Sequence, residues 1–153
     1  MYNLKNISSL KSVVKNLKIY FDPEFIVRQE FIDIKNNYNI DLPKNIMDQS
    51  LIYFSLLSNN IDLSDGFSTD SRIKKYNLHI LKDDKNIFPS YAAYPIINEN
   101  ALKKFYNIKK ILKKLENKIT QEKIIQLNYE ADEKGKNVYD IAYDFLKDEK
   151  LIL

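Results

Sequence analysis

Helix-like and strand-like segments alternate along the first half of this chain, and this order constrains its fold more than any other feature. Ser8 or Ser9 can cap the first helix, and Asp22-Pro23 opens the second, since proline is tolerated in a first helical turn. Helices are expected at 8–17, 22–38 and 47–60, and strands at 17–21, 61–67 and 76–81. Strands separated by helices are typical of an α/β fold with a parallel sheet.

The third of these helices and the C-terminal half complete the expected order of elements. In the third helix, Leu51, Tyr53, Phe54 and Leu57 are expected to pack inward. An extended segment with two prolines, "FPSYAAYPII", is followed by helical patterns at 98–118, 120–134 and 137–153. Thr120 is expected to cap the second of them and Gly135 to end it.

Composition excludes several classes of function. The 24 basic and 21 acidic residues leave a net charge of +3, which does not indicate a nucleic-acid partner. With no cysteine and one histidine, thiolate metal sites and cysteine nucleophiles are excluded, and we expect no metal, no cofactor and no catalytic residue. The longest apolar stretch, "LIYFSLL", is too short to cross a bilayer. No signal peptide is visible, so the chain as written is expected in the cytoplasm.

The stretch "GFSTDSRIKKY" is the best candidate for a binding site. Phe67 is expected at the carboxyl end of a strand, where open α/β sheets bind ligands, with Thr69 and Asp70 beside it. Tyr91 lies in another turn that follows a strand. Aromatic faces near a carboxylate suit an organic cation without N–H donors. Capping of a helix by Asp70 and core packing of Phe67 are the alternative roles.

Two stretches resemble a known family. "GFSTDSRIKKYNLHILKDDKNIFPSYAAYP", followed by "LNYEADEKGKNVYDIAYDFLK", resembles the second half of the substrate-binding proteins of osmoprotectant ABC importers, the receptors for glycine betaine, choline and carnitine. The shared motifs are the aromatic-Ser/Thr-Thr-Asp-x-Arg-Ile turn, the Leu-x-Asp-Asp-Lys turn, the Phe-Pro-x-Tyr segment and the Leu-Asn-Tyr helical tail. "FDPEFIVR" is similar to the family's Pro-Glu-Phe turn.

The resemblance implies a type II periplasmic-binding-protein architecture, in which an aromatic cage holds the ligand between two lobes. Residues 3–86 would form the complete second lobe, and 87–153 the hinge return and C-terminal helices of an incomplete first lobe. The implied ligand-binding residues are Phe67, Thr69, Asp70 and Tyr91, with Phe25 a weaker candidate. The implied partners are a small quaternary ammonium ligand and ABC permease subunits, outside the cytoplasm and at the membrane in full-length members.

The chain also departs from the family pattern. Gly66 stands where the family commonly has alanine, and Tyr94 where it has a small residue. The first-lobe segments that supply cage tyrosines are absent, so we expect a truncated receptor whose Met1 is an internal start. The apolar stripe of residues 99–148 would then be exposed and favour self-association.

Three functions stay open at this point. The first is a receptor module for an osmoprotectant. The second is a receptor for a related betaine such as ergothioneine, or a receptor domain that is fused to a permease. The third is a non-binding remnant or an interaction protein that pairs with a separate first lobe. An enzyme is the least favoured class, since no nucleophile–base pair or phosphate loop occurs.

Overall fold

The computed structural model describes residues 4–152, which divide into two compact units. Unit 1 comprises the described residues as far as Phe67 together with Leu78–Ser90. Unit 2 comprises Ser68–Asn77 and the described residues from Tyr91 onward. The assignment of residues 3–86 to one lobe and 87–153 to another stays a prediction, because contact units and receptor lobes are different divisions of a chain.

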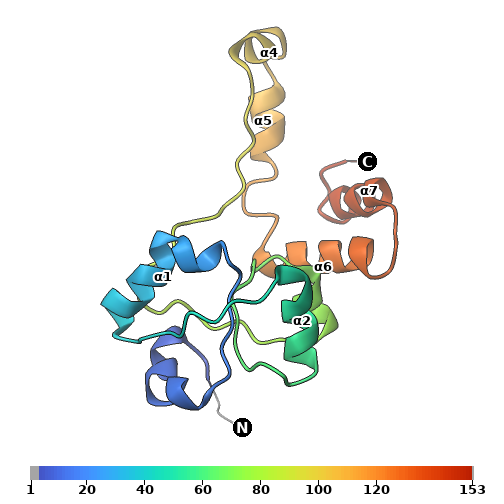
Figure 1. Ribbon diagram of the computed structural model, residues 1–153. Coiled ribbons are helices and arrows are strands. Elements are labelled where there is room, and N and C mark those ends of the chain that lie inside the picture. Colours follow the sequence, from blue (N-terminus) through green and yellow to red (C-terminus); the bar gives the residue numbers. More distant parts are fainter. Residues whose placement is uncertain (1–3, 153) are drawn as a thin grey trace. The chain divides into compact units, whose positions relative to one another are not determined.

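Unit 1 is built from short helical segments (Figure 1). They are the 3-10 turns η1 (Ile7–Ser12), η2 (Val14–Asn16) and η3 (Phe25–Val27), helix α1 (Gln29–Asp33), the π-helical η4 (Ile34–Tyr38) and helix α2 (Gln49–Leu57). The helix expected over 22–38 is therefore a series of three short segments. Asp22 accepts a hydrogen bond from the backbone N–H of Glu24 in the turn before this series. The N-cap position of η3 is Glu24, which makes no side-chain capping hydrogen bond, so the expected capping by Asp22 is wrong.

The expected strands are extended segments joined by isolated parallel bridges rather than regular strands in the described residues. Ile19 pairs with Leu63, Phe21 with Ile46, and Asn6 with Lys82. The segment around Ile19 and Phe21 thus lies between two parallel neighbours, which is the arrangement expected of the central strand of an α/β sheet. The prediction of regular strands at 17–21, 61–67 and 76–81 is therefore wrong. The first two of these segments are nevertheless paired with each other through the bridge between Ile19 and Leu63.

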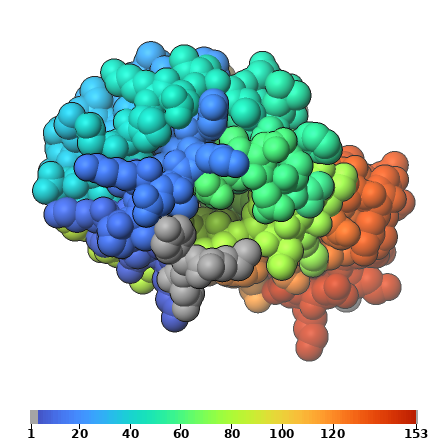
Figure 2. Space-filling view, turned by 60° about the horizontal axis from the view of Figure 1, so that its bottom comes forward, coloured from blue at the N-terminus to red at the C-terminus, as the bar shows by residue number. Residues whose placement is uncertain are grey.

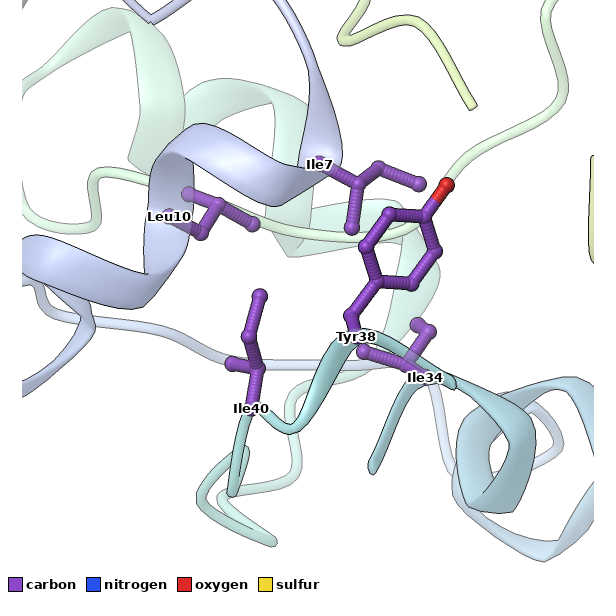
Figure 3. Close-up of a cluster of buried hydrophobic side chains, with 5 residues drawn as sticks. All are labelled: Ile7, Leu10, Ile34, Tyr38 and Ile40. Carbon is purple, nitrogen blue, oxygen red and sulfur yellow. The ribbon is translucent and has the colours of Figure 1, made fainter. Parts of the chain in front are cut away.

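Two adjoining hydrophobic clusters hold unit 1 together. Figure 3 shows the first, in which the ring of Tyr38 lies between Ile7 and Ile34, with Leu10 to the left and Ile40 to the lower left. The second contains Ile19, Phe21 and Phe31. In the space-filling view the N-terminal residues in blue pack directly against the cyan residues that follow α1 (Figure 2). All eight of these side chains are at most 8% exposed, so the face of the bridged segment that carries Ile19 and Phe21 is covered.

Helix α2 turns a different face inward from the one expected. Ile52 and Tyr53 are 1% and 4% exposed, whereas Leu51, Phe54 and Leu57 are 48–63% exposed. The segment "LIYFSLL" has apolar side chains on nearly every face, so its periodicity could not select which face contacts the core. The inward packing expected of Leu51, Phe54 and Leu57 is therefore wrong.

Unit 2 is entirely helical in its regular structure (Figure 1). Its helices are α3 (Ser71–Lys75), α4 (Glu99–Lys104), α5 (Ile108–Lys113), α6 (Gln121–Asp132) and α7 (Val138–Asp148). Thr120 accepts a hydrogen bond from the backbone N–H of Lys123, and Gly135 has a φ of +63°, which confirms the expected cap and stop of α6. The single helix expected over 98–118 is wrong, because Phe105 leaves helical geometry between α4 and α5. No helix in the described part of the chain is long and apolar enough to span a membrane.

Candidate ligand site

Gly66 and Asp65, the two residues before the candidate Phe67, are held by contacts within unit 1. A Cβ placed on Gly66 would lie 2.9 Å from the hydroxyl oxygen of Tyr53, closer than real Cβ contacts, so this backbone approaches the tyrosine as only glycine can. The neighbouring Asp65 accepts a 2.8 Å hydrogen bond from the backbone N–H of Asp22. Burial raises the pKa of the Asp65 carboxyl above its ordinary range, and the carboxylate of Asp22 adds to that effect. These two contacts therefore fix the position of the backbone just before Phe67.

The two aromatic candidates present much of their rings to solvent. Phe67, the last residue of its segment of unit 1, is 57% exposed. Tyr91, the first residue of the second segment of unit 2, is 65% exposed. Core packing of Phe67, the alternative considered from the sequence, is therefore wrong. An exposed aromatic face can attract a cation through the ring quadrupole, worth about 0.5–2 kcal/mol per ring depending on desolvation.

Thr69 and Asp70 form the polar part of the turn and the start of α3. The carboxylate of Asp70 accepts a 2.9 Å hydrogen bond from the backbone N–H of Arg72, which makes it the N-cap of that helix. It also accepts from the Arg72 guanidinium at 2.7 and 2.9 Å. The expected capping role of Asp70 is confirmed, and its ligand role stays a prediction.

Helix α6 anchors this turn through residues to which sequence reasoning assigned no role. The side-chain amide of Asn128 donates a 2.8 Å hydrogen bond to the carbonyl oxygen of Thr69. Lys75 pairs with Glu133, and the ammonium of Lys74 lies 5.4 Å from the centroid of the Tyr129 ring. The motif Leu-Asn-Tyr at 127–129 was the available signal, since it belongs to the quoted resemblance.

The weaker candidate, Phe25, packs within an aromatic cluster of unit 1. Its ring centroid lies 5.4 Å from that of Phe21, 5.8 Å from that of Phe31 and 6.5 Å from that of Phe88, the last pair being stacked. These distances are typical of aromatic pairs that stabilise a core. The position of Phe25 is thus explained by packing.

The "KDDK" turn at 82–85 is held by a buried phenol. The Tyr38 hydroxyl donates to Asp83 and accepts a 2.8 Å hydrogen bond from the backbone N–H of Lys85. Burial and the Asp83 carboxylate raise the pKa of Tyr38, so the phenol stays protonated. The carboxylate of Asp84 accepts from the hydroxyl of Ser8 at 2.5 Å. Both acids thus serve the turn, and no group of three or more metal-ligating side chains occurs in the described residues.

Comparison with known proteins gives a consistent result. The family model described as the substrate binding domain of the ABC-type glycine betaine transport system matches residues 1–148. The carnitine transport binding protein OpuCC of Listeria monocytogenes is 38% identical over 149 residues, which are 95% of this chain and 48% of that protein. The ergothioneine transport permease/ergothioneine binding protein EgtU of Helicobacter pylori is 34% identical over 95% of this chain and 27% of that one.

The fold agrees with these sequence matches. A solved structure described as a glycine betaine/carnitine/choline ABC transporter is 35% identical, with a TM-score of 0.88 over 98% of this chain and 56% of that chain. This chain therefore spans about half the length of the receptors it matches.

Proposed function

Since the chain belongs to the family of substrate-binding domains of ABC-type glycine betaine transport systems, we propose that it supplies part of a receptor for a quaternary ammonium osmoprotectant. The observation that supports this most directly is the family match over residues 1–148, which includes every candidate residue. The ligand would be glycine betaine, choline or carnitine, and the receiving partner would be an ABC permease on the extracytoplasmic side. Residues 3–86 would form one complete lobe and 87–153 part of the other. The role is binding, without catalysis.

The recognition chemistry follows from the ligand. A trimethylated ammonium has no N–H to donate, so hydrogen-bond acceptors select it poorly, whereas aromatic faces attract it without any donor. Phe67 and Tyr91, at 57% and 65% exposure, have ring surface to offer. Thr69 and Asp70 would shape the turn beside the ligand and supply negative potential.

The expected affinity of the 153 residues alone is low. Two rings at about 0.5–2 kcal/mol each give at most about 4 kcal/mol, which corresponds to a dissociation constant of about 1 mM. A receptor with further rings and a water-excluding closure would bind more tightly. A dissociation constant in the micromolar range for this chain alone would contradict the proposed incomplete cage.

The test is a calorimetric titration of the purified chain with choline, glycine betaine, carnitine and ergothioneine. Phe67→Ala and Tyr91→Ala are each expected to weaken the response about twofold or more, the loss of one ring contact of at least about 0.5 kcal/mol. Tyr139→Ala is the matched control, because Tyr139 is 75% exposed on α7. If the control weakens binding as much as Tyr91→Ala does, the assignment of the site is wrong.

Ergothioneine is the second candidate ligand. It is supported by the 34% identity to the Helicobacter pylori ergothioneine binding protein. A saturable response to ergothioneine alone in the same titration would favour it over the osmoprotectants. No response from a folded sample to any of the four compounds would favour a non-binding remnant.

A further inference from the structure

The segment Ser68–Asn77 carries two of the candidate ligand residues and belongs to unit 2, as helix α6 does. It contains Thr69, Asp70 and helix α3, and α3 packs against α6. A helix of five residues is too short to be stable without such packing. The conformation of the candidate turn therefore depends on how α6 holds this segment.

One face of α6 holds the C-terminal end of α3. Lys75 pairs with Glu133. The ammonium of Lys74 donates a hydrogen bond to the side-chain carbonyl of Gln126 and lies 5.4 Å from the centroid of the Tyr129 ring. Gln126, Tyr129 and Glu133 are spaced by three and four residues, so they share one face of the helix. These contacts hold α3 by its last turn, separately from the turn that precedes it.

Asn128 contacts the same segment from a different face of α6. It follows Gln126 by two residues, and side chains two residues apart do not face the same way on a helix. Its amide donates a 2.8 Å hydrogen bond to the carbonyl oxygen of Thr69. Asp70 is the N-cap of α3, so the carbonyl of Thr69, one residue earlier, lies outside the backbone hydrogen bonds of the helix. The bond from Asn128 thus fixes a peptide plane of the turn and is not needed to form α3.

We propose that Asn128 is a positioning residue for the candidate ligand site: its amide sets the orientation of the turn at Thr69 and Asp70, and this orientation sets the ligand affinity. The inference rests on the proposed function for its ligand, whereas the effect on the turn needs no ligand. Asp70 acts differently, because its carboxylate accepts from the backbone N–H and the guanidinium of Arg72 and so caps α3. Loss of Asn128 is therefore expected to change the turn and leave the helix.

Asn128→Asp is the sharpest perturbation of this contact. The two side chains have nearly the same shape, but an ionised carboxylate has no N–H to donate and repels the carbonyl oxygen of Thr69. The affinity is expected to fall about two- to tenfold, measured by calorimetric titration with glycine betaine, choline, carnitine and ergothioneine. Asn128→Ala, which removes the amide without adding charge and favours a helix, is expected to give a loss in the same range.

Glu133→Ala is the matched control. It removes a contact between α6 and the same segment, but from the face that holds the last turn of α3. It is expected to lower the affinity less than about twofold, since an ion pair near the surface contributes little. Circular dichroism and urea unfolding of each variant check that the helices persist.

Amide hydrogen exchange, followed by NMR, gives a readout that needs no ligand. The N–H of Arg72 is bonded to the Asp70 carboxylate, and the N–H of Tyr76 to the carbonyl of Arg72 at the end of α3. Asn128→Asp is expected to speed exchange at Arg72 about two- to tenfold and to leave Tyr76 within about twofold. Glu133→Ala is expected to speed exchange more at Tyr76 than at Arg72. A merely structural role of Asn128 would change both amides together.

Two outcomes would overturn the proposal. One is exchange that Asn128→Asp speeds equally at Arg72 and Tyr76, or at neither. The other is a ligand affinity that both substitutions of Asn128 leave unchanged, or that Glu133→Ala lowers as much as they do.

The two readouts keep this failure separate from failure of the proposed function. If the unsubstituted chain responds to none of the four compounds while the exchange pattern is the expected one, the ligand assignment fails and Asn128 still positions the turn. If the unsubstituted chain responds and the substitutions of Asn128 leave that response unchanged, the ligand assignment stands and the positioning role fails.

Discussion

Gly66→Ala is the substitution whose effect can be worked out most closely from the structure. The added Cβ would meet the hydroxyl oxygen of Tyr53 at 2.9 Å, and the next atom of that ring, Cζ, at 3.7 Å. Tyr53 is 4% exposed, so its hydroxyl cannot swing into solvent. Overpacking of this kind costs about 1–3 kcal/mol. The backbone of Gly66 does not lie in the left-handed region, so alanine also gains about 0.4–1 kcal/mol from a less flexible unfolded chain. The net expectation is a loss of between about 0 and about 2.6 kcal/mol.

A double-mutant cycle with Tyr53→Phe isolates the contact. Without the hydroxyl, the nearest atom to the new Cβ lies at an ordinary 3.7 Å, so Gly66→Ala should become neutral or stabilising in the Tyr53→Phe background. Urea unfolding measures the free energy of unfolding of the unsubstituted chain, the two single variants and the double variant. The cost of Tyr53→Phe itself cancels when the effect of Gly66→Ala is compared between the two backgrounds. Equal effects of Gly66→Ala in the two backgrounds would refute the steric argument. Because Phe67 follows directly, the ligand response is expected to fall and recover in parallel.

Two further predictions concern single polar groups. Tyr38→Phe removes the hydroxyl that links Asp83 to the backbone N–H of Lys85, so it should cost about 1–3 kcal/mol in urea unfolding; an effect no larger than that of Tyr139→Phe, at an exposed position, would contradict this. Burial raises the pKa of Asp65 in the folded state, so its contribution to stability is fully present below its ordinary pKa of 3.8 and is lost as pH rises through the raised value. Asp65→Asn should therefore remove the part of the fall in the urea unfolding midpoint that Asp65 causes above pH 3.8. If the midpoints of the unsubstituted chain and of Asp65→Asn change with pH in parallel, Asp65 does not have this effect.

Local signals were predictable from the sequence because they depend on neighbours within one turn. Asp70 and Thr120 cap the helices that follow them, and Gly135 ends α6 in the left-handed region. A helix cap needs only a short polar side chain just before the first turn, and a left-handed stop needs only a glycine just after the last turn. Tertiary contacts do not have to be known to predict them.

Features that depend on packing were not predictable in this way. The pattern over 98–118 is that of one long helix, yet α4 and α5 are six residues each. Short helices are marginal without a packed face, and Phe105 and Tyr106, which are 53% and 82% exposed, have little packing to gain. The face that α2 buries was equally undetermined, because apolar side chains surround it.

The candidate site shows where physical reasoning from sequence ends. Every contact given above for the Asp70 carboxylate is one that a helix cap and an arginine partner would need, so loss of stability in Asp70→Ala carries no information about a ligand. Phe67 is different, since a ring that is 57% exposed contributes little to folding. Phe67→Ala should change the free energy of unfolding by no more than about 0.5 kcal/mol. A fall in ligand response without a fall in stability is therefore the result that assigns this turn to binding.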